Sequence, residues 1–369
     1  MHYPRVDLVV GTRPEAIKLA PVVASLADAD IDLRLLFTGQ HPLDPADHGL
    51  EHHDRVTLTC RGKRNPLNHS DAVARAIGVV LADPPDLLVV HGDTSSALGG
   101  AMAGDAAGVP VAHVEAGLRS FDLAMPWPEE QHRVAIDRLS SLLFAPTEVS
   151  AANLRSEGVT GEILVTGNSG IDALFAALER LGPVELPPPR NRLRLLVTCH
   201  RRENWGRPMR GVAAALAHLA RDGTATIRVV LHPNPAVAEA MRRALAEIAQ
   251  VELLAPLKHI EMIAEMRRAD VILSDSGGVQ EEAPALGVPL LVLRDKTERA
   301  EGIASGNMLL AGTSRDRIIA LVMRLADPAI RATMSRPSLP FGDGRSGPRI
   351  AAAMIDWIAT RDGGLRRAG

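Results

Sequence analysis

The chain has 369 residues, of which 46% are hydrophobic and 23% charged, so it has the composition of a globular protein and the length of two domains. Its 41 lysines and arginines and 44 acidic residues give a net charge of −3, which excludes a global basic field for nucleic acid. No apolar run approaches the length of a membrane span, so no membrane insertion is expected, and two cysteines cannot form a disulfide framework, which favours a cytoplasmic location.

Short apolar runs alternate with longer helical patterns along the chain. The runs are continuous, which is typical of parallel strands buried on both faces. In chain order the predicted strands are 6–10, 33–37, 87–90, 109–114, 142–146, 193–198, 227–231, 251–254, 271–273 and 289–293. The predicted helices include 15–27, 72–81, 149–157, 171–181, 212–220, 236–249, 262–268 and 349–360. This alternation indicates right-handed βαβ units and therefore a doubly wound α/β fold.

The alternation is interrupted near the middle of the chain. Residues 183–190 are proline-rich, and the pattern restarts at Leu193. We therefore expect two Rossmann-like doubly wound domains that face a cleft. The expected segments are an N-terminal domain over 1–170, a helix and proline-rich linker over 171–190, a C-terminal domain over 191–345, and a last helix in 346–369 that returns to the N-terminal domain.

Polar side chains follow six of the predicted strands at their carboxyl ends, where open α/β sheets bind ligands. The six clusters are Gly11–Glu15, His91–Thr94, Glu115–Gly117, His200–Asn204, His232–Asn234 and Ser274–Gly278. Turns are polar in general, but six clusters that include histidine and arginine favour a site shared by the two domains.

Residues 276–282 predict a glycine turn that opens a helix. Gly277 and Gly278 allow the backbone to approach a ligand closely, and free N–H groups at a helix start suit a phosphate. Acids in a first turn stabilise a helix, which is a structural reason for Glu281 and Glu282. Since a carboxylate beside a phosphate is costly, we expect one of them to face ribose hydroxyls. No P-loop or dinucleotide-binding motif is present, so we predict no cofactor.

Several acids gathered in one cleft tend to have separated pKa values, which suits acid–base catalysis. The candidates are Asp93, Glu115 and Glu129. The positive groups that would offset these acids and could hold a diphosphate are Arg13, Lys18, Arg133, His200 and Arg299. Arg133 also lies four residues after Glu129, so a simple i,i+4 ion pair on a helix that begins near Pro128 is the structural alternative.

Glu51–Asp54 is the segment most suggestive of a metal, but it is irregular and polar and lacks the spacing of a metal motif. We therefore predict no metal site. Cys199 is expected to pack beside the site rather than act as a nucleophile, because nothing in its neighbourhood marks an activating base.

A set of ordered motifs extends from about residue 6 to Gly344. The motifs are 11–18, 38–41, 91–94, 113–119, 126–133, 166–168, 200–204, 275–282, 294–299 and 341–344. Together they resemble the motifs of the non-hydrolysing bacterial UDP-N-acetylglucosamine 2-epimerases. The resemblance implies a GT-B-like fold in which the second domain binds most of UDP.

The implied reaction is the reversible conversion of UDP-GlcNAc to UDP-ManNAc by anti elimination of UDP to 2-acetamidoglucal and re-addition on the other face. The C2 proton is not acidic, so the C1–O bond must largely break first, and carboxylates can stabilise the resulting oxocarbenium character. Neither a metal nor a nicotinamide is needed for this route. Relatives are commonly dimers, so a homodimer is expected.

The resemblance also assigns roles by position. It places acid–base residues at Asp93, Glu115 and Glu129, with Lys18 and His200 also in the active site. The substrate-binding positions are Arg13, Arg133, Ser276, Gly277, Gly278, Glu282 and Arg299. Gln40 and His232 match an allosteric site for a second UDP-GlcNAc. We expect Glu115 or Glu129 to be the C2 base and His200 to contact the diphosphate.

The chain departs from the family pattern at several positions. The segment 41–70 is compressed and does not align, and His132 stands where Asn is usual. His259 and Met262 stand where relatives often place Tyr and Phe. The alternative functions are a hydrolysing epimerase that releases UDP and free ManNAc, a GT-B glycosyltransferase, and a non-catalytic nucleotide-sugar sensor.

Overall fold

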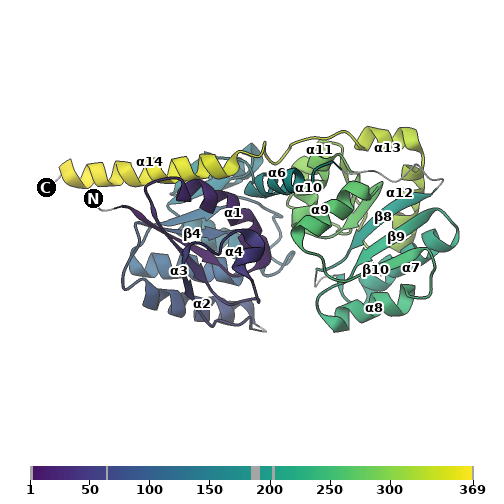
Figure 1. The fold of residues 1–369 in the computed structure, drawn as a ribbon, viewed down its shortest axis with the longest axis horizontal. Helices are drawn as coiled ribbons and strands as arrows, with labels where there is room; N and C mark the ends of the chain where they lie inside the picture. The colour runs from purple at the N-terminus through teal and green to yellow at the C-terminus, as the bar shows by residue number, and fades with distance from the viewer. Residues whose placement is uncertain (1–2, 64, 184–191, 202–203, 368–369) are drawn as a thin grey trace. The chain divides into compact units, whose positions relative to one another are not determined.

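The computed structural model describes residues 3–63, 65–183, 192–201 and 204–367. The chain divides into two compact units (Figure 1): unit 1 comprises Met1–Ala173 and Gly342–Gly369, and unit 2 comprises Leu174–Phe341. Most of the predicted proline-rich linker, 184–190, lies outside the described residues, as do Arg202 and Glu203 of the predicted cluster at 200–204.

Unit 1 contains a seven-stranded parallel sheet in the order β3-β2-β1-β4-β5-β6-β7. Its strands are β1 (Arg5–Val10), β2 (Asp32–Phe37), β3 (Asp54–Thr57), β4 (Leu87–His91), β5 (Val111–Val114), β6 (Leu142–Ala145) and β7 (Glu162–Val165). The helices are α1 (Arg13–Ala27), the 3-10 helix η1 (Pro45–His48), α2 (Pro66–Val80), α3 (Ser95–Ala107), α4 (Glu129–Leu139), α5 (Glu148–Glu157), the start of α6 (Ser169–Leu181) and α14 (Ser346–Arg367).

Both faces of this sheet are covered by helices, which explains why its central strands are mostly apolar. Side chains of β1 pack alternately into two clusters, Leu8 on one face and Val9 on the other. The cluster around Leu8 includes α1 and also Ile350 and Met354 of α14, which runs along α1 (Figure 1). The cluster around Val9 includes side chains of α2 and α3.

Unit 2 contains a six-stranded parallel sheet in the order β10-β9-β8-β11-β12-β13. Its strands are β8 (Leu193–Thr198), β9 (Ala225–Val230), β10 (Val251–Leu254), β11 (Val271–Ser274), β12 (Leu290–Val292) and β13 (Met308–Leu310). The helices are the remainder of α6, α7 (Arg207–Arg221), α8 (Pro235–Leu245), α9 (His259–Arg268), α10 (Gly277–Leu286), α11 (Ala300–Ala304), α12 (Arg315–Ala326) and α13 (Pro328–Met334).

The predicted class, two Rossmann-like doubly wound domains, is confirmed. Three strands were not predicted: β3, β7 and β13. Asp54, which the sequence placed in an irregular segment, begins β3. Among the described helices, none is both long enough and apolar enough to cross a membrane.

The strand order of each sheet reverses at one pair of neighbouring strands, which we call its switch point. The pair is β1 and β4 in unit 1, and β8 and β11 in unit 2. In open α/β sheets, ligands bind outside the carboxyl ends of the strands at such a point. Four of the six predicted clusters, 11–15, 91–94, 200–204 and 274–278, begin at or directly after the ends of these four strands, and so they start at switch points.

Candidate active site

The turn after β1 is organised by the buried side chain of Glu15. Its Oε2 accepts hydrogen bonds from the N–H of Gly11 at 2.9 Å and from the N–H and Oγ1 of Thr12 at 2.6 and 2.9 Å. Its Oε1 accepts a hydrogen bond of 2.6 Å from Oγ1 of Thr94, in the turn after β4. Burial raises the pKa of Glu15 to about 7, although these hydrogen bonds act in the opposite direction. The sequence motif included Glu15, but it was not predicted as a site residue.

Glu115 follows β5 with its backbone in the left-handed region, at φ 71°. A residue with a side chain is strained in that conformation, and such strain is concentrated at functional sites. The N–H groups of Glu115 and Ala116 both donate to the Phe144 carbonyl, at 3.1 and 3.0 Å, and this holds the turn. The carboxylate is thereby placed at the end of β5.

The Glu115 carboxylate is paired with Lys18 of α1, and both side chains are buried. Asn168 Nδ2 donates a 3.0 Å hydrogen bond to the same oxygen, Oε2. The structure therefore brings together two predicted site residues, Lys18 and Glu115. It adds Asn168, which belongs to a quoted motif but was not predicted to contact the site.

His91, the last residue of β4, is a buried neighbour of the Lys18–Glu115 pair. Its Nε2 is 3.8 Å from Oε2 of Glu115, beyond hydrogen-bond distance. Burial lowers the pKa of His91 to about 4, since the raising effect of Glu115 is smaller and Lys18 acts in the lowering direction. The ring is therefore neutral at pH 7, and it is Lys18 that forms an ion pair with Glu115.

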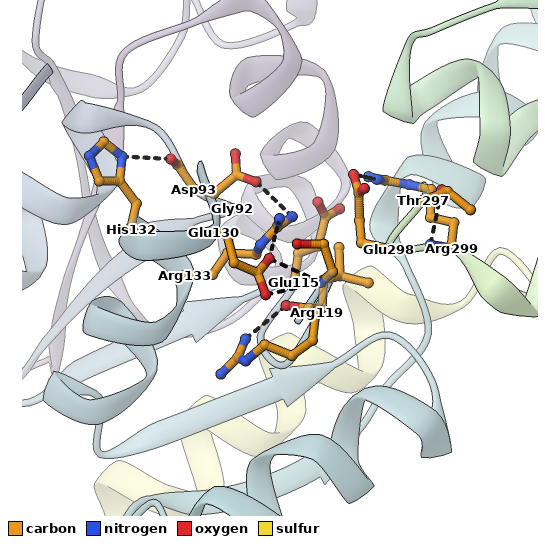
Figure 2. Close-up of polar contacts among 12 residues, drawn as sticks. Gly92, Asp93, Glu115, Arg119, Glu130, His132, Arg133, Thr297, Glu298 and Arg299 are labelled. Carbon is orange, nitrogen blue, oxygen red and sulfur yellow. Dashed lines mark hydrogen bonds and ion pairs between the residues drawn. The ribbon is translucent and has the colours of Figure 1, made fainter. Parts of the chain in front are cut away.

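Arg133 of α4 lies between two carboxylates (Figure 2). Its Nη1 is 3.1 Å from Asp93 Oδ2, and its Nη2 is 2.7 Å from Glu130 Oε2. His132 Nδ1 is 2.9 Å from the carbonyl oxygen of Asp93. The Arg133 side chain is only 1% exposed, whereas that of Asp93 is 27% exposed, so the buried guanidinium supports a carboxylate that solvent can reach. Glu129, the first residue of α4, is half-buried.

A second buried network fixes the backbone beside Asp93. His113 of β5 has Nε2 at 2.8 Å from the Gly92 carbonyl oxygen and Nδ1 at 2.6 Å from Asp137 Oδ1. Arg119 Nη2 donates a 2.6 Å hydrogen bond to the other Asp137 oxygen. Burial acts to raise the pKa of Asp137, but His113 and Arg119 outweigh it and hold that pKa below its usual value.

In unit 2 a buried carboxylate, Asp275, links the turns at the switch point. It accepts hydrogen bonds from the backbone N–H of His200 at 2.9 and 3.0 Å and from that of Arg201 at 2.9 Å. Asn204 Nδ2 donates to it at 2.7 Å. His200 is thus held by its backbone, and its ring centroid lies 5.3 Å from that of His232, after β9. Asp275 was part of a predicted cluster but was not predicted as a site residue.

The glycine turn predicted at 276–282 is the start of α10, with Ser276 as its N-cap. A Cβ on Gly277 would lie 2.8 Å from Nη2 of Arg299, so this glycine makes room for the guanidinium. A Cβ on Gly278 would have no neighbour within 4 Å. Gly278 therefore leaves open space beside the N–H groups at the start of the helix.

The two acids in this helix have different partners. Arg299 donates from Nε and Nη2 to Glu281 Oε1 at 2.8 and 2.6 Å, and its Nη1 is paired with Glu298 (Figure 2 shows the latter pair). Glu282 Oε1 lies 2.6 Å from His259 Nε2. Glu281 is therefore engaged by Arg299, and Glu282 by His259. Arg299 is flanked by two carboxylates rather than standing as an isolated cation.

The residues expected at an allosteric site lie in different units. Gln40, in unit 1, accepts hydrogen bonds through Oε1 from the N–H and Oγ of Ser96 at 3.1 and 2.7 Å. His232, in unit 2, accepts a 2.8 Å hydrogen bond at Nδ1 from the N–H of Asn234. Within the described ranges, no three His, Cys, Asp or Glu side chains are grouped so that they could hold a metal ion.

Comparisons with known proteins agree over nearly the whole chain. The family model described as UDP-N-acetylglucosamine 2-epimerase matches residues 24–355. The UDP-N-acetylglucosamine 2-epimerase of Yersinia pestis is 40% identical over 371 residues, covering 95% of this chain and 98% of the relative. That of Escherichia coli K12 is 37% identical over 382 residues, with coverage of 95% and 98%.

Solved structures show the same similarity. The UDP-GlcNAc 2-epimerase from Neisseria meningitidis bound to UDP-GlcNAc matches with a TM-score of 0.88 and 34% identity, covering 95% of this chain and 100% of that chain. The Methanocaldococcus jannaschii UDP-GlcNAc 2-epimerase in complex with UDP-GlcNAc and UDP matches with a TM-score of 0.84 and 31% identity, covering 95% and 99%. The resemblance found in the motifs is confirmed, and the chain belongs to the UDP-N-acetylglucosamine 2-epimerase family of enzymes.

Proposed function

We propose that this enzyme interconverts UDP-GlcNAc and UDP-ManNAc without hydrolysis, by anti elimination of UDP and re-addition through 2-acetamidoglucal. The observation that supports this reaction most directly is the buried Lys18–Glu115–Asn168 cluster, with Glu115 on a strained backbone. A base that removes a weakly acidic C–H proton must be fixed in place, and this cluster supplies such a carboxylate.

Unit 1 would supply the groups that act on the sugar. As the C1–O bond breaks, positive charge develops on the ring, and the carboxylates of Glu115 and Asp93 would stabilise it. Glu115 or Glu129 then takes the C2 proton, and a second acid returns a proton on the other face. Lys18 and Arg133 pair with Glu115 and Asp93 before the reaction, which holds these carboxylates in a fixed orientation.

Unit 2 would bind most of UDP. The N–H groups at the start of α10, beside the open space at Gly278, suit a phosphate, and His200 would contact the diphosphate. Glu282, oriented by His259, would accept hydrogen bonds from ribose hydroxyls. Arg299 would support the start of α10 from its position against Gly277. The leaving UDP remains bound in this arrangement, so that it can attack C1 again.

The test is the identity of the products formed from UDP-GlcNAc, separated by anion exchange. We expect UDP-ManNAc as a minority component at equilibrium and little free UDP. Free ManNAc with stoichiometric UDP would instead assign a hydrolysing epimerase. UDP-GlcNAc that stays unchanged until an acceptor sugar is added would assign a glycosyltransferase.

Glu115→Gln is the control that ties the activity to this site. It removes the charge but keeps the shape of the side chain, and Glu115 belongs to unit 1, whereas the proposed UDP-binding residues lie mainly in unit 2. Turnover should therefore fall by at least about a thousandfold while UDP binding changes little. A parallel loss of UDP binding would show that Glu115 has a different role.

A further inference from the structure

Glu15 takes no part in the reaction proposed above, although it lies between two turns that carry residues of the proposed site. It lies in the first turn of α1, directly after β1, and it binds Thr94 in the turn after β4. These two strands form the switch point of unit 1. Arg13, the first residue of α1, is next to Thr12, and Asp93 is next to Thr94 in the turn after β4.

One oxygen of Glu15 is sufficient to begin α1. Oε2 receives all three hydrogen bonds from Gly11 and Thr12, which completes the capping of the helix. Oε1 is bonded to Thr94 Oγ1, which is itself the N-cap of α3 and accepts from the N–H of Ala97 at 3.0 Å. A glutamine could cap α1 through its single carbonyl oxygen, so the second oxygen has a use beyond this helix.

The two turns are also in direct contact. A Cβ at Gly11 would lie 2.0 Å from Oγ of Ser96, the second residue of α3, and 2.8 Å from Oγ1 of Thr38. The turn after β1 thus packs against the start of α3 with no room for a methyl group. Packing alone does not need a buried ionisable group, which costs free energy to remove from water.

Unit 2 contains the same arrangement. Asp275, which is completely buried, follows β11 and binds the backbone of the turn after β8, including that of His200. Each sheet therefore has one buried carboxylate that crosses its switch point. In unit 2 the turn held by Asp275 contains His200, a residue of the proposed site. In unit 1 the residues held by Glu15 are Thr12 and Thr94, and their neighbours Arg13 and Asp93 also belong to the proposed site.

We propose that Glu15 is a positioning residue that links the turn after β1 to the turn after β4 and so fixes Arg13 and Asp93 relative to each other. It acts through these two residues and not on the substrate. The inference rests on the proposed function for the roles of Arg13 and Asp93.

Substitutions at Thr94 separate this link from the capping of α1. Thr94→Val removes the hydroxyl group that binds Glu15, and Thr94→Ser retains it. Thr147→Val is the matched control, because Thr147 caps α5 by accepting a 3.1 Å hydrogen bond from the N–H of Ser150. Both valine variants lose one helix cap. The measurements are kcat and KM with UDP-GlcNAc, and the thermal unfolding midpoint of the full chain.

We expect both valine variants to lose stability, Thr94→Val more than Thr147→Val because it also leaves Glu15 Oε1 without its partner, whereas only Thr94→Val lowers kcat, by at least about tenfold with a smaller change in KM. Thr94→Ser should restore kcat to within about threefold of wild type. Glu15→Gln keeps an oxygen for Gly11 and Thr12 and an amide group that can donate to Thr94 Oγ1, so it should lower kcat less than Thr94→Val does.

Wild-type kcat in Thr94→Val would overturn the proposal and leave Glu15 as a helix cap only. If Glu15→Gln does not fold, the two Thr94 variants decide the question by themselves. A wild-type chain without epimerase activity would contradict the proposed function instead, so the two failures can be told apart.

Discussion

Two buried glutamates of unit 1 are stabilised in different ways. Glu115 is paired with the ammonium group of Lys18, whereas Glu15 is surrounded by uncharged donors from Gly11, Thr12 and Thr94. Hydrogen bonds from neutral groups compensate less for the loss of water than an opposite charge does. This explains why the pKa of Glu15 rises to about 7.

The raised pKa predicts how stability depends on pH. Glu15 binds its proton more tightly in the folded chain than in the unfolded chain, so its stabilising contribution is complete below its usual pKa of 4.5 and is lost as the pH rises to about 7. The contribution is on the order of 3 kcal/mol, at about 1.4 kcal/mol for each tenfold change in proton affinity.

Urea unfolding at pH 5 and pH 8 measures this effect in wild type and Glu15→Gln. Between these pH values the wild type should lose more free energy of unfolding than the variant, by up to about 3 kcal/mol. Other groups, such as His91, titrate in both proteins and cancel in the comparison. If the free energy of unfolding depends on pH in the same way in both proteins, the raised pKa of Glu15 is contradicted.

The sequence selected charged candidates for the site but not the residues that hold them in place. Asp93 and Glu115 were predicted because they belong to polar clusters at strand ends, and Lys18 was predicted as a cation that offsets such acids. Glu15 was not distinguished from an ordinary helix-capping acid, and Asn168 and Asp275 were motif members without an assigned contact. Which oxygen binds which donor depends on residues distant in sequence, as in the pair of Glu15 with Thr94, and no local pattern contains that information.

At the scale of elements, the start of α10 is the feature that most clearly suits a ligand. Its first two residues are glycines with opposite surroundings, since Gly277 is packed against Arg299 and Gly278 faces open space. Arg299 cannot move aside easily, because Glu281 and Glu298 hold its guanidinium. We therefore expect Gly277 to serve packing against Arg299 and Gly278 to leave room for a ligand.

Alanine substitutions test this distinction. Gly278→Ala should leave the unfolding midpoint equal to or slightly above that of wild type, because alanine favours a helix by roughly 0.5–1 kcal/mol, and it should weaken UDP binding at least about tenfold. Gly277→Ala should lower the midpoint. Calorimetric titration with UDP and thermal unfolding give both quantities, and unchanged UDP affinity in Gly278→Ala would remove the start of α10 from the phosphate site.

The sequence predicted the buried strands better than the edge strands. The ten predicted strands correspond to strands of the structure, because a strand covered on both faces is a continuous apolar run, as in β4. The edge strands β3 and β7 are mostly exposed or half-buried, and polar residues occupy positions of β3 such as Asp54 and Arg55. Their pairing with β2 and β6 is a tertiary effect that the local pattern does not contain.

At the scale of the whole molecule, the two units share one design. Each has a parallel sheet with a buried carboxylate across its switch point, Glu15 in unit 1 and Asp275 in unit 2. The two units differ in the polar groups that lie near the carboxyl ends of their strands. Unit 1 presents carboxylates paired with cations, which suit proton transfer, and unit 2 presents a helix start and histidines, which suit a diphosphate. This division agrees with a reaction in which the nucleotide leaves the sugar and returns to it.

The central claim is that the C2 proton is removed and replaced while UDP is retained. The most direct measurement is proton NMR of UDP-GlcNAc incubated with the enzyme in D₂O. Loss of the C2 proton signal from both UDP-GlcNAc and UDP-ManNAc, with deuterium at C2 of each sugar and without accumulation of free ManNAc, is the result that we predict. Formation of UDP-ManNAc that retains the original C2 proton, or the absence of exchange at C2, would contradict the account.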